Sequence, residues 1–330
     1  MPAKRVRCRA CAHRCVIPPG RRGVCRVRFN REGRLFVPWG YSAGVAVDPV
    51  EKKPFFHMLP GSQVLTFGML GCNFRCAYCQ NWITSQALRD PAAGWAVEEI
   101  SPEALVAAAR EFGAEGVASS YNEPLITAEW AAAVFREAKA AGLRTAMVSN
   151  GYGTGKVLEY LRPWCDALKV DLKTVRDPQY RRLGGRVDPV LETVRLAQEM
   201  GLWVEVVTLV VPGFNDSDAE LAEAAEFIAS VSPDIPWHVT AFHPDYRMGD
   251  VPPTDAARLL EAARTGERAG LRFVYMGNVP PWLAGRFETT WCPHCHEPVV
   301  ERRGFRVVAN RLGPRGKCPR CGSRVPGVWA

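Results

Sequence analysis

Three closely spaced cysteines have the residue type and spacing needed to hold an iron–sulfur cluster. Cys72, Cys76 and Cys79 follow a Cys-x-x-x-Cys-x-x-Cys spacing in the segment Gly-Cys-Asn-Phe-Arg-Cys-Ala-Tyr-Cys. A 4Fe-4S cubane has four irons, so three thiolates leave one iron open to bind a substrate. Structural zinc needs four ligands. Because this loop has no nearby fourth Cys or His, zinc would require a distant residue such as Cys165.

A repeated pattern of strands and helices surrounds this loop between residues 60 and 285. Short β-branched runs alternate with amphipathic stretches, one of which should begin with Ser101 as N-cap and Pro102 at the first helical position. Strand starts recur about every 20–36 residues, which predicts strand–helix units that close fully or partly into a barrel. The expected strands span residues 63–67, 116–120, 144–148, 166–170, 202–211, 237–242 and 271–275.

Polar residues follow several of these strands, at the edge where such folds carry their chemistry. They are Glu123, Ser149, Asn150, Asp171, Lys173 and His243. Lys169, Asp171 and Lys173 would share one face of a strand, and three charges there are costly unless they bind a ligand or form ion pairs. Glu123 could accept hydrogen bonds from an amine, or could act as a cap or in a salt bridge. His243 could contact a ligand or have a structural role.

The cysteine segment resembles the signature of the radical S-adenosylmethionine (SAM) superfamily, in which an aromatic residue, here Tyr78, precedes the last cysteine. The resemblance implies that SAM chelates the open iron through its amino and carboxylate groups. It also implies that the reduced cluster cleaves SAM to methionine and a 5′-deoxyadenosyl radical, which abstracts hydrogen from a substrate.

Further segments resemble the SAM-contacting segments of this superfamily. The Glu-Pro part of a Gly-Gly-Glu-Pro-like motif is present, but Tyr121 and Asn122 stand in place of its glycines. Ser149-Asn150-Gly151 and Asp171-Leu172-Lys173 resemble segments of pyruvate formate-lyase-activating enzyme. The resemblance implies cofactor contacts for Tyr78, Glu123, Ser149, Asn150, Asp171 and Lys173. His243 is added to this predicted set because of its position after a strand.

A set of four cysteines near the C-terminus has the spacing of a metal-binding ribbon. Cys292-Pro-His-Cys295 and Cys318-Pro-Arg-Cys321 are typical of two zinc knuckles. Rubredoxin-type iron and a second iron–sulfur cluster are the alternatives. Four thiolates leave no open metal position, so we expect this site to be structural.

A second set of four cysteines near the N-terminus is less regular. It consists of Cys8, Cys11, Cys15 and Cys25. Four thiolates could close a structural zinc site or hold an auxiliary cluster, and His13 could replace one cysteine. Cys165 has no clustered partner, so we expect it to pack in the core.

Composition and charge narrow the class of protein further. With 47% hydrophobic and 23% charged residues the 330-residue chain is typical of a globular protein. No stretch approaches the ~20 apolar residues of a membrane span, and the N-terminal segment lacks the pattern of a signal peptide, so we expect a cytoplasmic protein.

The net charge of +8 divides into +10 for residues 1–34, −8 for 35–284 and +6 for 285–330. The positive charge of the two ends would offset the negative charge of thiolates bound to metal. Nucleic-acid binding is therefore the less favoured interpretation of the positive charge.

The whole chain resembles the radical SAM component of the AmmeMemoRadiSam system. The matching segments include Tyr-Asn-Glu-Pro, Ser-Asn-Gly-Tyr, Val-Asp-Leu-Lys and the final Pro-Gly-Val-Trp. The resemblance implies an α/β fold with a partial (β/α)6 TIM-like barrel over residues 60–285, preceded by a metal-binding segment (1–59) and followed by a zinc-ribbon-like domain (286–330). It also implies Amme-type and Memo-type protein partners and a reductant such as flavodoxin or ferredoxin.

Three functions follow from these observations. The first is modification of a protein, peptide or small molecule by a SAM-derived radical together with those partners. The second is activation of a glycyl-radical enzyme. The third is a non-catalytic, metal-rich protein whose basic ends bind nucleic acid.

Overall fold

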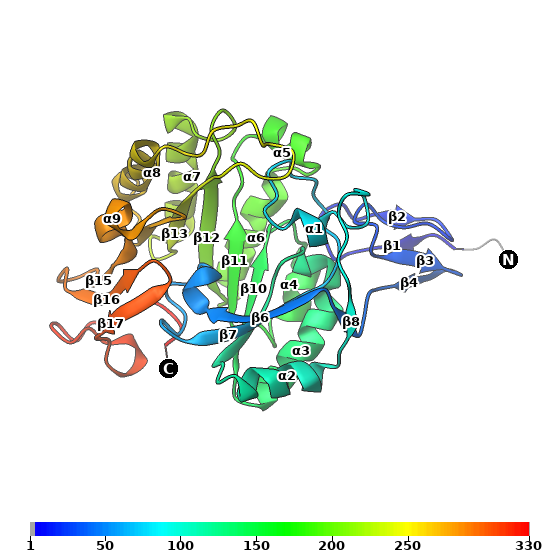
Figure 1. Cartoon of the computed structure of the whole chain (residues 1–330), viewed down its shortest axis with the longest axis horizontal. Coiled ribbons are helices and arrows are strands. Elements are labelled where there is room, and N and C mark those ends of the chain that lie inside the picture. The colour runs from blue at the N-terminus through cyan, green and yellow to red at the C-terminus, as the bar shows by residue number, and fades with distance from the viewer. Residues whose placement is uncertain (1–3, 330) are drawn as a thin grey trace.

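The computed structural model describes residues 4–329 and is built around one eight-stranded sheet (Figure 1). The strand order is β14-β13-β12-β11-β10-β9-β7-β6, in which β6 is antiparallel to β7 and all other neighbours are parallel. The strands span Gly44–Pro49 (β6), Gln63–Gly68 (β7), Gly116–Ser119 (β9), Arg144–Ser149 (β10), Ala167–Asp171 (β11), Trp203–Val210 (β12), Trp237–Ala241 (β13) and Val274–Gly277 (β14). Within the described residues β14 and β6 do not pair with each other. The predicted α/β fold with a partial barrel is therefore confirmed.

The parallel strands match the sequence-based prediction with small shifts. Residues 4–329 contain seven parallel strands, one more than the six of a (β/α)6 repeat. The largest shift is in β14, which begins at Val274 instead of Leu271. The Leu271 N–H bonds the Gly266 carbonyl at 3.2 Å, and the Arg272 N–H bonds the Pro233 carbonyl at 3.0 Å. These two bonds hold Leu271 and Arg272 in the connection between helix and strand, so pairing with β13 starts later.

Helices connect successive strands of the sheet. They span Trp82–Ser85 (α1), Pro102–Glu111 (α2), Ala128–Ala140 (α3), Gly155–Leu161 (α4), Asp177–Leu183 (α5), Asp188–Glu199 (α6), Asp218–Val231 (α7), Ala256–Arg268 (α8) and Pro281–Ala284 (α9). Ser101 caps α2 as predicted, since its side-chain oxygen accepts the Ala104 N–H at 3.2 Å. In the described part of the chain, no helix has both the length and the apolar composition required to cross a membrane.

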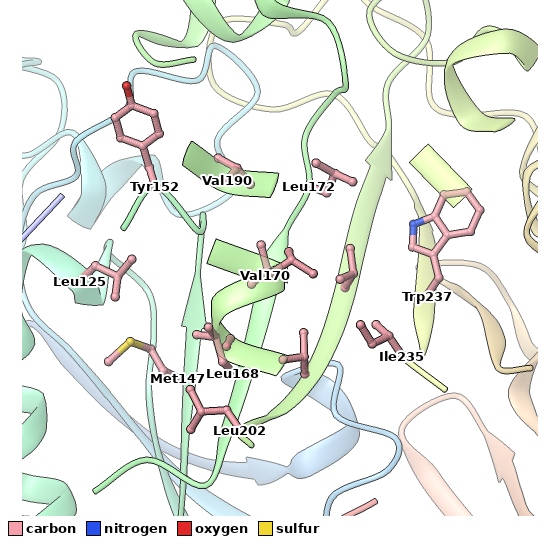
Figure 2. Packing of buried hydrophobic residues seen from close by; sticks show 14 of the residues in the cluster. Leu125, Met147, Tyr152, Leu168, Val170, Leu172, Val190, Leu202, Ile235 and Trp237 are labelled. Atoms are coloured by element: carbon pink, nitrogen blue, oxygen red, sulfur yellow. The ribbon is translucent and has the colours of Figure 1, made fainter. Parts of the chain in front are cut away.

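The main hydrophobic core lies between the sheet and its helices. Figure 2 shows Met147 of β10 and Leu168 and Val170 of β11 in one cluster with Val190 of α6. Because successive side chains of a strand point to opposite faces, the residues between these apolar positions point away from the helices. In β11 this arrangement fixes the face on which Lys169 lies.

Short antiparallel pairs form the N-terminal part of the structure. They are β1 (Val6–Arg7) with β2 (Val16–Ile17), β3 (Phe29–Arg31) with β4 (Arg34–Phe36), and β5 (Tyr41–Ser42) with β8 (Glu98–Glu99). The Ala12 N–H donates to the Tyr152 carbonyl at 3.0 Å, and the His13 ring nitrogen Nε2 lies 3.2 Å from the Asn73 carbonyl oxygen. The segment is thereby attached to the loops that follow β10 and β7.

The C-terminal part is a three-stranded antiparallel sheet at the opposite end of the molecule (Figure 1). Its strands are β15 (Thr290–Trp291), β16 (Pro298–Arg303) and β17 (Arg306–Asn310). The fully buried guanidinium of Arg302 donates to the Phe56 carbonyl at 2.6 Å and to Thr290 Oγ1 at 2.9 Å, and it lies 3.3 Å from Glu51. This buried ion pair joins the C-terminal sheet to the segment that precedes β7.

A buried histidine belongs to the same junction. Nδ1 of His57 lies 2.7 Å from the Pro326 carbonyl and Nε2 lies 2.7 Å from the Tyr275 hydroxyl. A neutral ring satisfies both contacts, because Nδ1–H donates to the carbonyl and Nε2 accepts from the hydroxyl. Burial lowers the pKa of His57 to about 4.

We predict that acidification destabilises the fold through His57. Between pH 7 and 5.5 the unfolded chain binds a proton at an imidazole of pKa about 6.5, whereas the folded chain does not, so stability falls as the pH falls. The expected loss from this residue is about 1 kcal/mol. Denaturant unfolding at the two pH values should show a smaller pH effect in His57→Gln than in the exposed control His243→Gln. Equal pH effects in the two variants would contradict the prediction.

Candidate functional site

The parallel register brings the carboxyl ends of β7, β9, β10 and β11 to one edge of the sheet. Phe67 of β7 and Met147 of β10 both pair with Ser119 of β9, and Asp171 of β11 pairs with Val207 of β12. Two adjoining cavities, of about 90 and about 380 Å³, lie at this edge. Both cavities are lined by residues from the loops after β7, β9 and β11, so chain segments far apart in the sequence form one site.

The smaller cavity contains most of the residues that the sequence singled out. Its lining includes the three cysteines and five of the predicted cofactor-binding residues, namely Cys72, Cys76, Cys79, Glu123, Ser149, Asn150, Asp171 and Lys173. Tyr78 lines the larger cavity. His243 is exposed and lines neither of the two cavities, and its Nε2 lies 2.9 Å from Nε2 of Gln80. The structure thus brings together all these residues except His243; their binding roles stay predictions.

The three cysteines line one cavity, as an iron–sulfur cluster with one open iron would require. Burial raises the pKa of Cys76 to about 12, so a thiolate there requires a cationic partner such as iron. Of the residues that line the smaller cavity, none is a fourth cysteine or a histidine. Cys165 lies just before the start of β11, whereas the cavity lies at the end of this strand, and its Sγ is 3.2 Å from the Ala167 carbonyl. A four-ligand zinc site completed by Cys165 is therefore wrong, and its core location agrees with the packing role.

Glu123 is both a cap and a wall of the smaller cavity. Its carboxylate accepts the Leu125 N–H at 2.9 Å, the Ser149 hydroxyl at 2.7 Å and the Asn150 N–H at 2.8 Å. Burial raises the pKa of Glu123 to about 7, although these three donors favour the ionised form. The capping role considered from the sequence is present, and the same side chain lines the cavity.

Asp171 holds two lysines at the boundary of the two cavities. It pairs with Lys169 and, at 3.2 Å, with Lys173. Burial by itself raises the pKa of Asp171, but the two lysines outweigh this effect and lower the pKa to about 2. The three side chains share one face, as predicted, and pair with one another. The trio therefore carries one excess positive charge into the cavities.

Sequence reasoning missed a second pair of lysines at the site. Lys52 and Lys53, between β6 and β7, line the larger cavity together with Tyr121. A Lys-Lys pair in a charged segment has no periodicity or spacing that distinguishes it from a solvated surface. Only the antiparallel addition of β6 to the sheet carries these lysines to the cavity.

The terminal cysteine sets differ in how closely their sulfurs approach. In residues 4–329, one group of metal-ligating atoms lies within 4.8 Å of one another, and it consists of Cys292, Cys295, Cys318 and Cys321. This spacing suits a single metal ion, in agreement with two knuckles. A zinc ion at this position remains a prediction.

The N-terminal set does not reach single-ion spacing in the described residues. Cys8 packs with Ile17, Cys25 packs with Val27, and Cys11 belongs to the main core, so three of its members lie in different hydrophobic clusters. His13 contacts the loop that follows β7. A metal site formed by this set stays a prediction.

Loss of one C-terminal cysteine should destabilise the fold. Cys318 is buried, and Cys318→Ala removes one of the four sulfurs that would bind the metal. We expect the metal content to fall by about one ion per chain and the melting temperature by about 5–10 °C. Metal analysis and thermal unfolding measure both. The control is Ser323→Ala, which alters a neighbour of Cys321 but no predicted ligand. Unchanged metal content and melting temperature in Cys318→Ala would argue against the site.

Comparisons with known proteins agree with this geometry. The Radical SAM superfamily model matches residues 67–228. An uncharacterized protein of Methanocaldococcus jannaschii is 36% identical over 324 residues, which covers 97% of this chain and 95% of that protein. The chain therefore belongs to the radical SAM superfamily, whose members use SAM and a 4Fe-4S cluster.

More distant relatives share the central part of the chain. The pyruvate formate-lyase-activating enzyme of Staphylococcus epidermidis is 26% identical over 226 residues, or 62% of this chain and 88% of that enzyme. The structure of a radical SAM methyltransferase from Sphaerobacter thermophilus matches with a TM-score of 0.50 at 17% identity, over 67% of this chain and 68% of that one. The second likeness shows a common fold.

Proposed function

We propose that this protein cleaves SAM reductively at a 4Fe-4S cluster held by Cys72, Cys76 and Cys79, and directs the resulting radical to a substrate in the larger cavity. One observation carries the proposal: three thiols, that of Cys76 buried and those of Cys72 and Cys79 partly buried, line one cavity that adjoins a larger one. The residues that line this cavity include no fourth cysteine and no histidine. Four-ligand structural sites are closed, so this arrangement supports a reactive centre.

The side chains around the cluster position have separable tasks. Cys72, Cys76 and Cys79 would hold the cluster, which would supply in its reduced form the electron for splitting SAM into methionine and a 5′-deoxyadenosyl radical. The Lys173 ammonium, beside Asp171, faces the cavities and would hold a carboxylate, while Glu123 would accept hydrogen bonds from an amine. Tyr78 is buried and its ring packs against Phe214 at 5.5 Å, which helps to exclude water from the reaction.

The proposal predicts that Cys76→Ala abolishes both the cluster signal and SAM cleavage. Removing a thiolate leaves the cluster with too few protein ligands to be retained. Electron paramagnetic resonance of the reduced, reconstituted protein measures the cluster, and chromatography measures 5′-deoxyadenosine. Cys165→Ala is the matched control, because this buried cysteine lies away from the cavity, and we expect it to retain both signals.

Two outcomes would contradict the proposal. Unchanged SAM cleavage in Cys76→Ala would show that this cysteine is not needed to hold the reactive cluster. An intact cluster in the wild-type protein without SAM cleavage would favour a non-catalytic, metal-rich protein.

We further propose that the enzyme acts with Amme-type and Memo-type proteins and takes its electron from a flavodoxin or ferredoxin. The support is the resemblance of the whole chain, including both terminal cysteine sets, to the radical SAM component of that system. A glycyl-radical activase is the second candidate. It is favoured by the 26% identity to an enzyme named as pyruvate formate-lyase-activating, although that likeness covers 62% of this chain.

The two candidates differ in where the abstracted hydrogen originates. In the presence of SAM and reductant, we expect added Amme-type and Memo-type proteins to increase formation of 5′-deoxyadenosine. Deuterated candidate substrates would then transfer deuterium to this product, as measured by mass spectrometry. A glycyl radical signal on an added glycyl-radical enzyme, without any effect of the two partner proteins, would instead establish the activase.

A further inference from the structure

We propose that Lys52 and Lys53 form an oxyanion-binding wall in the larger cavity, and that the substrate carries a carboxylate or phosphate group which binds there. This inference rests on the proposed function, because it names the chemical class of the substrate of that site. It concerns residues in the segment between β6 and β7, which the cysteine motif and its neighbouring strand ends do not include.

Two similar groups of charges face the larger cavity. In one, Asp48 pairs with Lys52 Nζ at 2.6 Å and with Lys53 Nζ at 2.9 Å. In the other, Asp171 pairs with Lys169 and Lys173. Each group contains two ammonium ions and one carboxylate, so each has one excess positive charge. All four lysines and Asp171 line the larger cavity, but Asp48 does not. The wall formed by Lys52 and Lys53 is therefore cationic.

The two groups serve different parts of the site. Asp171 and Lys173 line both cavities and therefore lie beside the three cysteines. Lys52 and Lys53 line only the larger of these two cavities. Near the cysteines, Asp171 and Lys173 are available for SAM. The charge of Lys52 and Lys53 is left for a second molecule in the larger cavity, and an oxyanion satisfies paired ammonium donors.

Lys53 is held in place for such a contact. Its side chain is 6% exposed, and its Nζ lies 3.3 Å from the Tyr121 hydroxyl and 4.8 Å from the centre of the Tyr121 ring. A buried ammonium held by a carboxylate, a hydroxyl and an aromatic face loses little conformational entropy when it binds a ligand. Lys52 is half exposed and could follow the ligand.

The backbone at Tyr121 is a second, independent observation. Tyr121 has φ of +69°, in the left-handed region that is strained for a bulky residue. Gly68 makes room for it, because a Cβ at residue 68 would lie 2.9 Å from the Tyr121 Cβ. A strained tyrosine that lines the cavity and contacts Lys53 supports a function for its side chain in ligand recognition.

Binding of two simple anions tests the inference. The full-length protein, reconstituted with its cluster and saturated with SAM, is titrated with inorganic phosphate and, separately, with succinate in a calorimeter under anaerobic conditions. We expect at least one anion to bind saturably with one equivalent per chain. Lys53→Met should weaken that binding about tenfold, as expected for loss of one charge-assisted contact. Lys53→Arg should keep it within about threefold. Phosphate binding alone indicates a phosphate-bearing substrate, and succinate binding alone a carboxylate-bearing one.

Two further variants separate recognition from folding. Lys156→Met removes an exposed lysine of α4 that pairs with Glu159 and should bind the anions as the wild type does. If Lys53→Met fails to fold, as judged by thermal unfolding and the cluster spectrum, Lys52→Met replaces a half-exposed lysine and should weaken binding about threefold.

Several results would overturn the inference. They are binding unaffected by Lys53→Met and Lys52→Met, displacement of both anions by SAM, or no saturable binding of either anion by the wild type. SAM cleavage by the wild type without any anion is measured on the same samples. Lys53-dependent binding without SAM cleavage refutes the proposed function alone, whereas SAM cleavage without anion binding refutes only this inference.

Discussion

The parallel register of β7 and β9 to β14 is the constraint on which the rest of the structure depends. Parallel pairing aligns the carboxyl ends of neighbouring strands, so the loops that follow them meet at one edge. Ser119 lies beside both Phe67 and Met147 in this register. A shift of one residue in β11 would exchange the faces of Val170 and Asp171, placing a charge in the core and an apolar side chain in the cavity.

Buried charge is the second feature that organises the molecule. At the site, each of two carboxylates holds two lysines, and the resulting excess positive charge opposes the negative charge expected of thiolates bound to iron. At the other end of the structure, Arg302, Glu51 and the neutral His57 join the C-terminal sheet to the segment before β7. Since that same segment continues into Lys52 and Lys53, the C-terminal sheet helps to fix one wall of the larger cavity.

Local patterns in the sequence predicted most of the fold. The seven parallel strands, the cap at Ser101 and the shared face of Lys169 and Asp171 all follow from short-range periodicity and residue type. The start of β14 was misplaced, because hydrogen bonds from Leu271 to a preceding helix compete with strand pairing. His243 follows β13 as expected, yet it is exposed and turned toward Gln80. Sequence position places a residue after a strand but does not give the direction of its side chain.

The sequence by itself determined the chemistry available to this protein: three cysteines at cluster spacing, two further sets of four, and polar residues after successive strands. Such features are local, because residue types and their spacing along the chain are enough to recognise them. Only the tertiary structure decided which residues share a cavity. It placed Lys53 and Tyr121 beside the cysteine loop, brought the C-terminal sulfurs within 4.8 Å and distributed Cys8, Cys11 and Cys25 over three hydrophobic clusters. These contacts join segments far apart in sequence, so they depend on the packing of the whole sheet.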